Sequence, residues 1–238
     1  MTGATKTKVA ADLVVAVDGP ASSGKSATFA RVAEKLGMRF IDTGLFYRAA
    51  CLTALRYGMD CADTDAICEQ VLVTEGDKPW GLQFHTDGTV SIFERDGEQR
   101  VTVKDLGSPK IDSVVSTVAS NARVRQKLMG LQRRLANQQK PCIVLGRDIG
   151  TVILPEAKIK IYLDSSVEAR ANRRFSQFGS KGALSYEEVY EAIARRDEAD
   201  KTRAVSPLVK PDDAIVIDNT NLSLEDTVQR AVDVITGK

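Results

Sequence analysis

Residues 13–26 read LVVAVDGPASSGKS, and this stretch decides the fold. Leu13–Val17 is a continuous apolar run, which is typical of a strand buried on both faces of a parallel sheet. Gly19 to Ser26 fit the pattern GxxxxGK[ST], and the helical periodicity that begins at Gly24 ends at Gly37. A buried strand, a glycine-rich turn and a helix in this order predict a phosphate-binding loop.

This loop predicts a site for a nucleoside triphosphate. Its glycines let backbone N–H groups turn toward phosphate oxygens, and the helix N-terminus adds a partial positive charge. Lys25 would place a charge beside the β- and γ-phosphates, and Ser26 would offer its hydroxyl to Mg²⁺. We therefore expect a nucleoside triphosphate and Mg²⁺ as cofactors, with the nucleotide bound by Gly19, Pro20, Ala21, Ser22, Ser23, Gly24, Lys25, Ser26 and Ala27.

The rest of the chain alternates strand and helix patterns. Apolar runs at 38–41, 141–145, 158–163 and 214–217 predict further strands, and the segments between them, including 63–73, 111–120, 123–138, 185–201 and 224–235, predict helices. Residues 80–103 alternate and contain two DG turns, which predicts an antiparallel meander. The pattern predicts an α/β, three-layer P-loop fold with a central parallel sheet and a small antiparallel insert. Its ligands should bind at the carboxyl ends of the strands.

Composition excludes several classes of protein. The net charge of the 238 residues is +1, and no apolar run approaches the roughly 20 residues of a membrane span, so we expect neither a nucleic-acid nor a membrane partner. The four cysteines form no CxxC pair and the chain has one histidine, His85, which argues against a zinc site and gives His85 no catalytic role. Reduced thiols and the absence of a secretory signal indicate a cytoplasmic protein.

A second group of residues predicts a second phosphate site. Thr43, Tyr47 and Arg48 begin the helix that follows the second strand, and in this topology that helix starts beside the phosphate loop. Arg147 follows another core strand, at the same edge of the sheet. A tyrosine hydroxyl and two guanidinium groups suit a monophosphate on an acceptor. No NKxD motif is present, which argues against a GTPase.

Six motifs together resemble bacterial cytidylate kinases. They are DGPASSGKS, DTGLFYRA, RVRQKLMGLQR, GRDIGT, KIYLDSSVEARANRR and RRDEADKTRAVSPL, in the order and spacing of that family, over Val14 to about Ile235. The resemblance implies a kinase that transfers the γ-phosphoryl of MgATP to CMP or dCMP. The expected organisation is a disordered tail at 1–11 and one kinase domain at 12–238. Within it, the core covers 12–60, 111–165 and 205–238, the monophosphate-binding insert 61–110 and the helical lid about 170–187.

The resemblance also implies residue roles. Asp148 would accept from the cytosine N4 amino group, Arg125 would donate to N3 and O2, and Ser116 would assist. The CMP phosphate would be held by Tyr47, Arg48, Arg147 and Arg196, while Asp200 would hold the sugar hydroxyls. Arg203 would bridge donor and acceptor phosphates, so the implied catalytic set is Lys25, Arg147, Arg196 and Arg203. Relatives usually carry an acidic residue where this chain has Leu145, close to the expected metal.

Two helical patterns complete this prediction. Arg196, Asp200 and Arg203 are spaced i, i+4 and i+7, which places them on one helix face, with Asp197 interpreted as part of a solvated ladder. Arg173 and Arg174 precede the tip at 178–183 and are expected to close over ATP as a lid.

Three alternatives remain beside a monomeric CMP kinase. A UMP or AMP kinase, a shikimate-type kinase and a nucleotide-binding regulator without turnover all contain a similar loop. The pairing of Asp148 with Arg125 argues against UMP, and the insert argues against a minimal shikimate-type chain. The retained Lys25, Arg147 and Arg203 argue against a regulator.

Overall fold

The computed structural model describes residues 9–73, 79–85, 89–178 and 185–238, which form two compact units. The first unit comprises Met1–Ile41 and Ala136–Lys238, and the second comprises Asp42–Leu135. Most of the tail expected at 1–11 and of the tip expected at 178–183 lies outside the described residues. The insert expected at 61–110 lies within the second unit.

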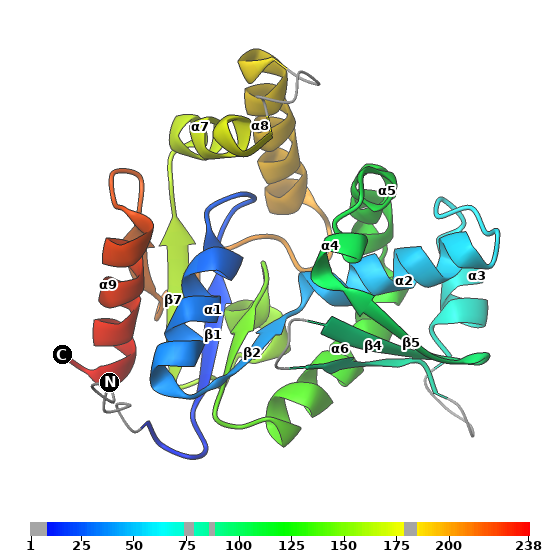
Figure 1. The fold of residues 1–238 in the computed structure, drawn as a ribbon, viewed down its shortest axis with the longest axis horizontal. Coiled ribbons are helices and arrows are strands. Elements are labelled where there is room, and N and C mark those ends of the chain that lie inside the picture. The colour runs from blue at the N-terminus through cyan, green and yellow to red at the C-terminus, as the bar shows by residue number, and fades with distance from the viewer. Residues whose placement is uncertain (1–8, 74–78, 86–88, 179–184) are drawn as a thin grey trace, which may run out of the picture. The chain divides into compact units, whose positions relative to one another are not determined.

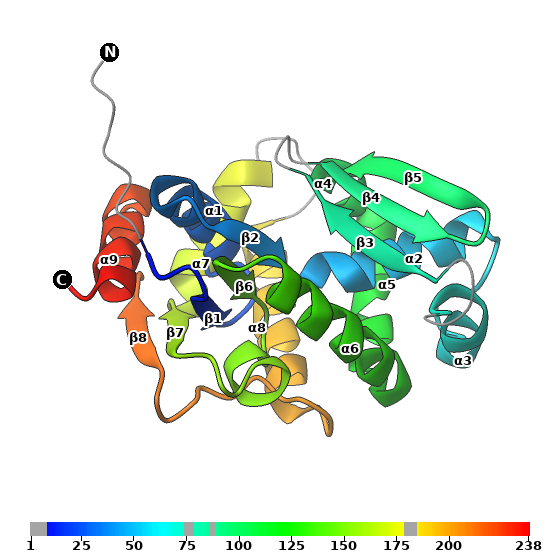
Figure 2. The same ribbon diagram turned by 90° about the horizontal axis from the view of Figure 1, so that it is seen from below.

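The first unit (Figure 1) is built on a five-stranded sheet in the order β2-β6-β1-β7-β8, whose strands are all labelled in Figure 2. The strands are β1 (Val14–Asp18), β2 (Arg39–Asp42), β6 (Cys142–Leu145), β7 (Ile159–Asp164) and β8 (Ile215–Asp218). β1 pairs in parallel with β6 and β7, and β7 pairs in parallel with β8. The register that pairs Val17 with Leu145 brings the phosphate loop and the segment after β6 to the same edge of the sheet. The central parallel sheet predicted from the sequence is confirmed.

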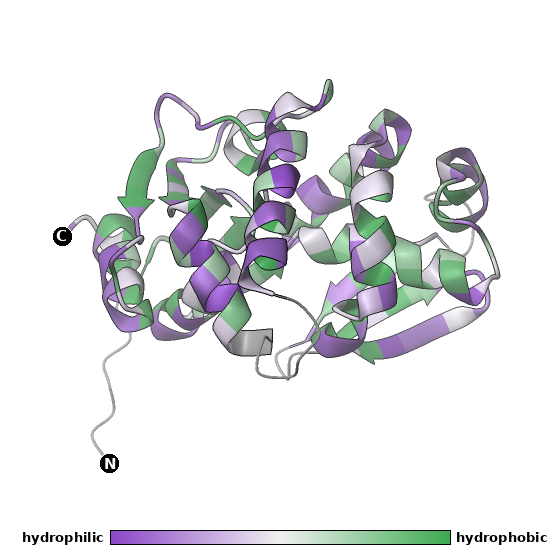
Figure 3. Cartoon of the chain, turned by 90° about the horizontal axis from the view of Figure 1, so that it is seen from above, coloured by the Kyte–Doolittle hydropathy of each residue, from purple (hydrophilic) through white to green (hydrophobic). Residues whose placement is uncertain are grey.

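Helices cover this sheet. α1 (Lys25–Leu36) and α9 (Leu224–Thr236) pack side by side against it, as the view from below shows (Figure 2). Their apolar faces join the strands in one core that contains Val15, Val17, Phe29, Ile143, Leu163 and Val228. The π-helix η2 (Ile149–Ile153) contacts β1. The hydropathy colours along the helices alternate between purple and green, as expected for elements with one buried face (Figure 3).

Two further helices of the first unit pack on each other. α7 (Val167–Phe178) and α8 (Tyr186–Thr202) join through a small apolar cluster of Ala171, Val189 and Ile193. Ser185 caps α8 in a capping box, since its hydroxyl accepts from Glu188 N while the Glu188 carboxylate accepts from Ser185 N. α8 ends at Thr202, so Arg203 is its C-cap residue rather than part of the helical face.

The second unit combines helices with a small sheet. β3 (Gly81–Phe84), β4 (Thr89–Glu94) and β5 (Gly97–Thr102) form the predicted antiparallel sheet, in the order β3-β4-β5. The helices are α2 (Gly44–Arg56), α3 (Thr64–Ala66), α4 (Val103–Leu106), α5 (Pro109–Ser120) and α6 (Ala122–Gln138), whose last turn crosses into the first unit. The single helix expected at 63–73 is replaced by α3 and a π-helix, η1 (Ile67–Val71). No helix in the described part of the chain is long and apolar enough to cross a membrane.

Candidate active site: a phosphate loop and arginine–carboxylate networks

The phosphate loop has the backbone shape that its glycines predict. Gly19 has a φ of 150°, and a Cβ atom at this position would lie 2.2 Å from the Leu163 carbonyl oxygen of β7. Gly24 is the N-cap residue of α1, in the left-handed conformation with a φ of 88°. Both positions therefore need glycine, the first because of space and the second because of its dihedral angle.

Lys25 folds back onto its own loop. Its Nζ donates to the carbonyl oxygens of Gly19 and Pro20, both at 2.7 Å, and lies 3.2 Å from Ser23 Oγ. The ammonium group is thus held within the loop by oxygens of the loop itself. Ser26, one residue along α1, is exposed at the helix N-terminus, as is Ala27.

Neighbouring segments hold the loop through its backbone. Asn219, which follows β8, donates from Nδ2 to Ser23 O at 3.0 Å. Ala21 N donates to Asp197 Oδ1 at 3.0 Å, and Arg170 donates to Ala21 O at 3.0 Å. The interpretation of Asp197 as a solvated residue is therefore wrong: its residue exposure is 5% and it pairs with Arg170 at 2.5 Å.

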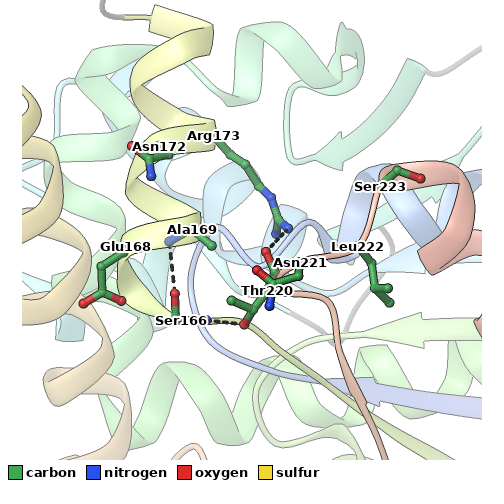
Figure 4. Close-up of a pocket in the computed structure, with 9 residues that line it drawn as sticks. All are labelled: Ser166, Glu168, Ala169, Asn172, Arg173, Thr220, Asn221, Leu222 and Ser223. Carbon is green, nitrogen blue, oxygen red and sulfur yellow. Dashed lines mark hydrogen bonds between the residues drawn. The ribbon is translucent and has the colours of Figure 1, made fainter.

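An open groove of about 550 Å³ lies between the start of α7 and the loop after β8 (Figure 4). Arg173 points across it from α7 and donates to the carbonyl oxygens of Asn219 at 2.5 Å and Thr220 at 3.5 Å. Burial lowers the pKa of Arg173. Because Asn219 also contacts Ser23, the groove adjoins the phosphate loop. Arg174, the second residue expected in the lid, lies on the exposed side of α7.

The carboxyl end of β6 leads into a network of arginines and carboxylates. Arg147 donates from Nε to Asp200 Oδ2 at 2.9 Å. Arg203 lies 3.4 Å from Asp200 Oδ1 and 3.8 Å from Asp148 Oδ1, and it donates to Ser206 O at 2.5 Å. The predicted residues Arg147, Asp148, Asp200 and Arg203 are thus brought together in the first unit. Arg196 is exposed on α8.

Asp18, at the end of β1, binds the backbone of the segment that follows Asp148. It is buried at the end of β1 and accepts from Ile149 N at 2.8 Å and Gly150 N at 2.7 Å, the residues that follow Asp148. Burial raises its pKa to about 6, against the opposing effect of the two backbone hydrogen bonds. Leu145, the position at which the family resemblance implies an acidic residue, is buried at the end of β6.

The second unit holds the remaining predicted residues. Arg48 on α2 pairs with Asp112 at 2.7 Å and donates to Leu106 O at 2.9 Å. The Arg125 guanidinium on α6 lies 5.4 Å from the centre of the Tyr47 ring and donates to Ala119 O at 3.1 Å. Tyr47 and Arg125 therefore form one cluster within this unit.

Two other predicted residues of this unit occupy different positions. Thr43 is the N-cap residue of α2 and is buried. Ser116 lies on the exposed side of α5.

The cysteines and the histidine lie in structural settings. All four thiols are free and buried, and burial raises the pKa of Cys51 to about 12 and that of Cys142 to about 11. His85 Nε2 lies 2.7 Å from Ser91 Oγ, beside the small sheet. These protonated thiols are poor nucleophiles.

The sequence did not reveal the importance of Arg170 and Asp197, although it carried a signal. Val189, Ile193 and Asp197 are spaced i, i+4 and i+8, and all three are buried on one face of α8. A carboxylate at the end of such an apolar stripe indicates a buried charge that needs a partner.

The sequence of this chain is similar to those of known proteins of one family. The family model for cytidylate kinase matches residues 15–237. The chain is 40% identical over 225 residues to the cytidylate kinase of Rhodococcus opacus (strain B4), covering 94% of this chain and 95% of the relative. It is 40% identical over 228 residues to the cytidylate kinase of Mycobacterium avium (strain 104), covering 95% and 96%.

A solved structure shows a similar fold at low sequence identity. An uncharacterized protein from Eubacterium ventriosum ATCC 27560 aligns with a TM-score of 0.51 at 12% identity, over 95% of this chain and 99% of that one. The identity to the curated kinases extends over nearly the whole chain, and it coincides with an intact phosphate loop and an arginine network. The chain therefore belongs to the cytidylate kinase family of nucleoside monophosphate kinases.

Proposed function

We propose that this protein transfers the γ-phosphoryl group of MgATP to CMP or dCMP, giving ADP and CDP or dCDP in one in-line step. The observation that carries this proposal is the arginine network beside the loop: Arg147 and Arg203 share the carboxylate of Asp200, at the sheet edge from which the loop departs. The family match over residues 15–237 supports the same reaction. We further propose a cytoplasmic monomer.

The donor nucleotide is assigned to the phosphate loop and the adjoining groove. The N–H groups of the loop and the N-terminus of α1 would bind the β- and γ-phosphates, and Lys25 would add its charge to the oxygens that gain charge in the transition state. The groove beneath Arg173 offers about 550 Å³ next to the loop, which is enough for a nucleoside. Arg173 and Arg174 would then lie over the donor and exclude water.

The acceptor phosphate is assigned to Arg147, Arg196, Arg48 and Tyr47, the residues that the family resemblance implies for this role. Arg147 and Arg48 are held by Asp200 and Asp112, so each guanidinium is already oriented by a carboxylate. Arg203 is assigned to the transferring phosphoryl group, because one delocalised cation can contact oxygens of both donor and acceptor. Asp200 would also accept from the sugar hydroxyls.

Base recognition is assigned to Asp148, Arg125 and Ser116. A carboxylate accepts from the N4 amino group of cytosine, whereas uracil would present an oxygen there and be repelled. The Arg125 guanidinium donates to Ala119 O and lies beside the Tyr47 ring, so its plane has a defined orientation. We assign this guanidinium to N3 and O2 of the base. Thr43 is the N-cap residue of α2, one turn before Tyr47, and we assign it to the same substrate site.

The residues present fit a magnesium ion that is carried mainly by the nucleotide. No group of three or more potential metal ligands occurs among the described residues, and Asp18 is committed to two backbone N–H groups. Ser26 would supply one hydroxyl, and phosphate oxygens and water would supply the remaining ligands, as is usual for Mg²⁺ in kinases. When bound, the ion neutralises phosphate charge.

A coupled ADP-release assay tests the proposal. Wild type is measured with MgATP and CMP, dCMP, UMP, AMP or shikimate, beside Asp148→Ala and the control Asp213→Ala. Asp213 is an exposed carboxylate of the same unit that pairs with Lys160. We expect CMP and dCMP to be the best acceptors. We expect Asp148→Ala to reduce the preference of CMP over UMP by about 100-fold, because a hydrogen bond to a charged group contributes about 1.5–3 kcal/mol. Asp213→Ala should keep that preference.

The alternatives give different results in the same assay. A wild type that prefers UMP, AMP or shikimate would identify another small-molecule kinase. ATP binding without phosphorylation of any acceptor would identify a nucleotide-binding regulator. Either result would contradict the proposed function.

A further inference from the structure

A buried ion pair forms hydrogen bonds with both backbone groups of Ala21, a residue of the phosphate loop. Arg170 of α7 and Asp197 of α8 pair at 2.5 Å, with side-chain exposures of 4% and 7%. Asp197 Oδ1 accepts from Ala21 N at 3.0 Å, and Arg170 donates to Ala21 O, also at 3.0 Å. The pair therefore joins three segments that lie far apart in the sequence.

Arg170 is itself anchored on another side. Its Nε donates to Ser165 O at 2.9 Å and lies 3.3 Å from Ser166 O, in the turn between β7 and α7. A lysine has no such fork of donors and cannot make all of these contacts at once. The guanidinium thus connects the end of a core strand, the loop and α8.

Holding α7 against α8 does not require this pair. Ala171, Val189 and Ile193 already join the two helices through apolar contacts. A buried ion pair also contributes little net stability relative to an apolar pair of similar size, because both charges lose their hydration. What the ion pair adds is a directional link from α8 to the loop, since only polar groups can bond to the Ala21 backbone.

That link fixes the rotation and the height of α8. Asp197 directly follows Arg196 and precedes Asp200 by three residues. A slip of one residue along a helix displaces side chains by about 1.5 Å and rotates them by about 100°. A misplacement of about 1 Å in a reacting group can reduce a rate about 100-fold.

We propose that Arg170 and Asp197 are positioning residues that lock α8 to Ala21, so that the arginines at the end of α8 meet the phosphoryl group held by the loop. The inference rests on the proposed phosphoryl transfer and adds two residues to it. Neither residue touches the substrate in this role. Their effect should therefore appear in kcat rather than in the affinity for ATP.

Asp197→Asn tests this role against a purely structural one. The amide oxygen can still accept from Ala21 N, but the amide NH₂ group then faces the Arg170 guanidinium. We expect kcat to fall about 100-fold, and the Kd for MgATP, measured by calorimetry, to stay within about threefold. Arg170→Lys, which keeps the charge and loses the fork, should lose less of kcat than Asp197→Asn.

Ile193→Ala is the matched control. Ile193 lies one turn before Asp197 on the same buried face, and the substitution removes apolar contact between α7 and α8 without touching Ala21. We expect it to lower the thermal midpoint at least as much as Asp197→Asn does. Well below that midpoint, its kcat should stay within about threefold of wild type.

The outcomes separate this inference from the proposed function. An active wild type with an equally active Asp197→Asn would overturn the inference alone. A kcat of Ile193→Ala that falls as far as that of Asp197→Asn would also overturn the inference, because loss of packing alone would then explain the effect. A wild type that phosphorylates no cytidine monophosphate would overturn the proposed function and this inference with it. If Asp197→Asn does not fold, Arg170→Lys is compared with Ile193→Ala instead, by the same measurements of kcat, the Kd for MgATP and the thermal midpoint.

Discussion

The phosphate loop and the arginine network are held in different ways. The loop is fixed through its backbone: Ala21 is bonded to Arg170 and Asp197, Ser23 O accepts from Asn219, and Gly19 lies against the Leu163 carbonyl. The arginines are held through their charged ends, which contact carboxylates. Arg147 and Arg203 share Asp200, and Arg48 pairs with Asp112.

This difference is what the proposed roles of the two regions require. A loop that donates backbone N–H groups needs a fixed shape, and hydrogen bonds to its carbonyl oxygens supply that shape. Arginines that contact an acceptor need orientation and must also be able to move to the substrate. A carboxylate supplies orientation without a covalent or steric constraint, and its net contribution to stability near the surface is small. The two regions should therefore respond differently to substitution.

The largest expected effect belongs to Arg203, which we propose contacts the transferring phosphoryl group. Arg203→Met should lower kcat with CMP about 1,000-fold, because a bridging arginine acts mainly in the transition state. The Kd for MgATP should change little. Steady-state kinetics and calorimetry check both values.

A matched control tests whether loss of any α8 arginine has this effect. Arg195 pairs with Glu191 at i, i+4 on the exposed side of α8, and Arg195→Met should stay within about twofold of wild type in kcat. A loss of less than tenfold in Arg203→Met would show that the network does not contact the transferring phosphoryl.

Gly19→Ala tests the phosphate loop, where the shape of the backbone rather than charge is decisive. The new Cβ would lie 2.2 Å from Leu163 O at a φ of 150°, so the loop must move. We expect a loss of about 4 kcal/mol in the free energy of unfolding, from overpacking and backbone strain together, and a weaker affinity for MgATP. Urea unfolding and calorimetry measure the two effects.

Gly58→Ala separates the clash from the dihedral strain. Gly58 has a φ of 69°, but no atom lies within 4 Å of the position of a Cβ. It should lose only about 1 kcal/mol, the cost of a left-handed alanine. Equal losses in both variants would show that the contact with Leu163 O does not constrain the loop.

The loop and the sheet were predictable because their signals are local. The strand, the glycines and Lys25 lie within 14 consecutive residues, 13–26, and their spacing alone requires the observed turn. The antiparallel meander was predictable for the same reason, from its alternation and its DG turns. The helix expected at 63–73 differs in type, since no local pattern distinguishes a π-helix from an α-helix there.

The contacts that hold the loop were not predictable in the same way. Asp197 lies 176 residues after Ala21, and Asn219 lies 196 residues after Ser23, so only the folded chain brings them together. Asp197 and its exposed neighbours Arg195 and Arg196 belong to the same charged segment. The position of Asp197 on the buried face, four residues after Ile193, was the signal that distinguished it.

Asp18→Asn measures how strongly a buried carboxylate supports the segment beside the loop. Its pKa of about 6 is above the usual 3.8, so the protonated form is favoured on folding. The corresponding stability is present below pH 4 and is lost as the pH rises through 6. The stability difference between wild type and Asp18→Asn should therefore fall by about 2 kcal/mol from pH 4.5 to 6.5.

Urea unfolding at pH 4.5, 5.5 and 6.5 gives this difference directly. Asp213→Asn is the control, because Asp213 is exposed and the hydrogen bond from Lys160 lowers its pKa. Its stability difference should not fall over the same range. A pH-independent difference for Asp18→Asn would show that Asp18 titrates as an ordinary carboxylate.

The smallest expected effect tests whether the carboxylates of the network compete with substrate or only orient the arginines. Asp112→Asn removes the charge that pairs with Arg48, while Leu106 O still accepts from the same guanidinium at 2.9 Å. The pair is only partly exposed, and an ion pair near the surface contributes about 0.2–1 kcal/mol. Release of Arg48 should therefore lower the KM for CMP about twofold to threefold at low salt and leave kcat unchanged. Asp65→Asn, which removes a carboxylate that pairs with exposed Arg123 in the same unit, should not change KM. A KM that rises instead would show that the orientation of Arg48 by Asp112 contributes more to CMP binding than the release of the Arg48 charge does. The arginines would then depend on fixed geometry as the loop does.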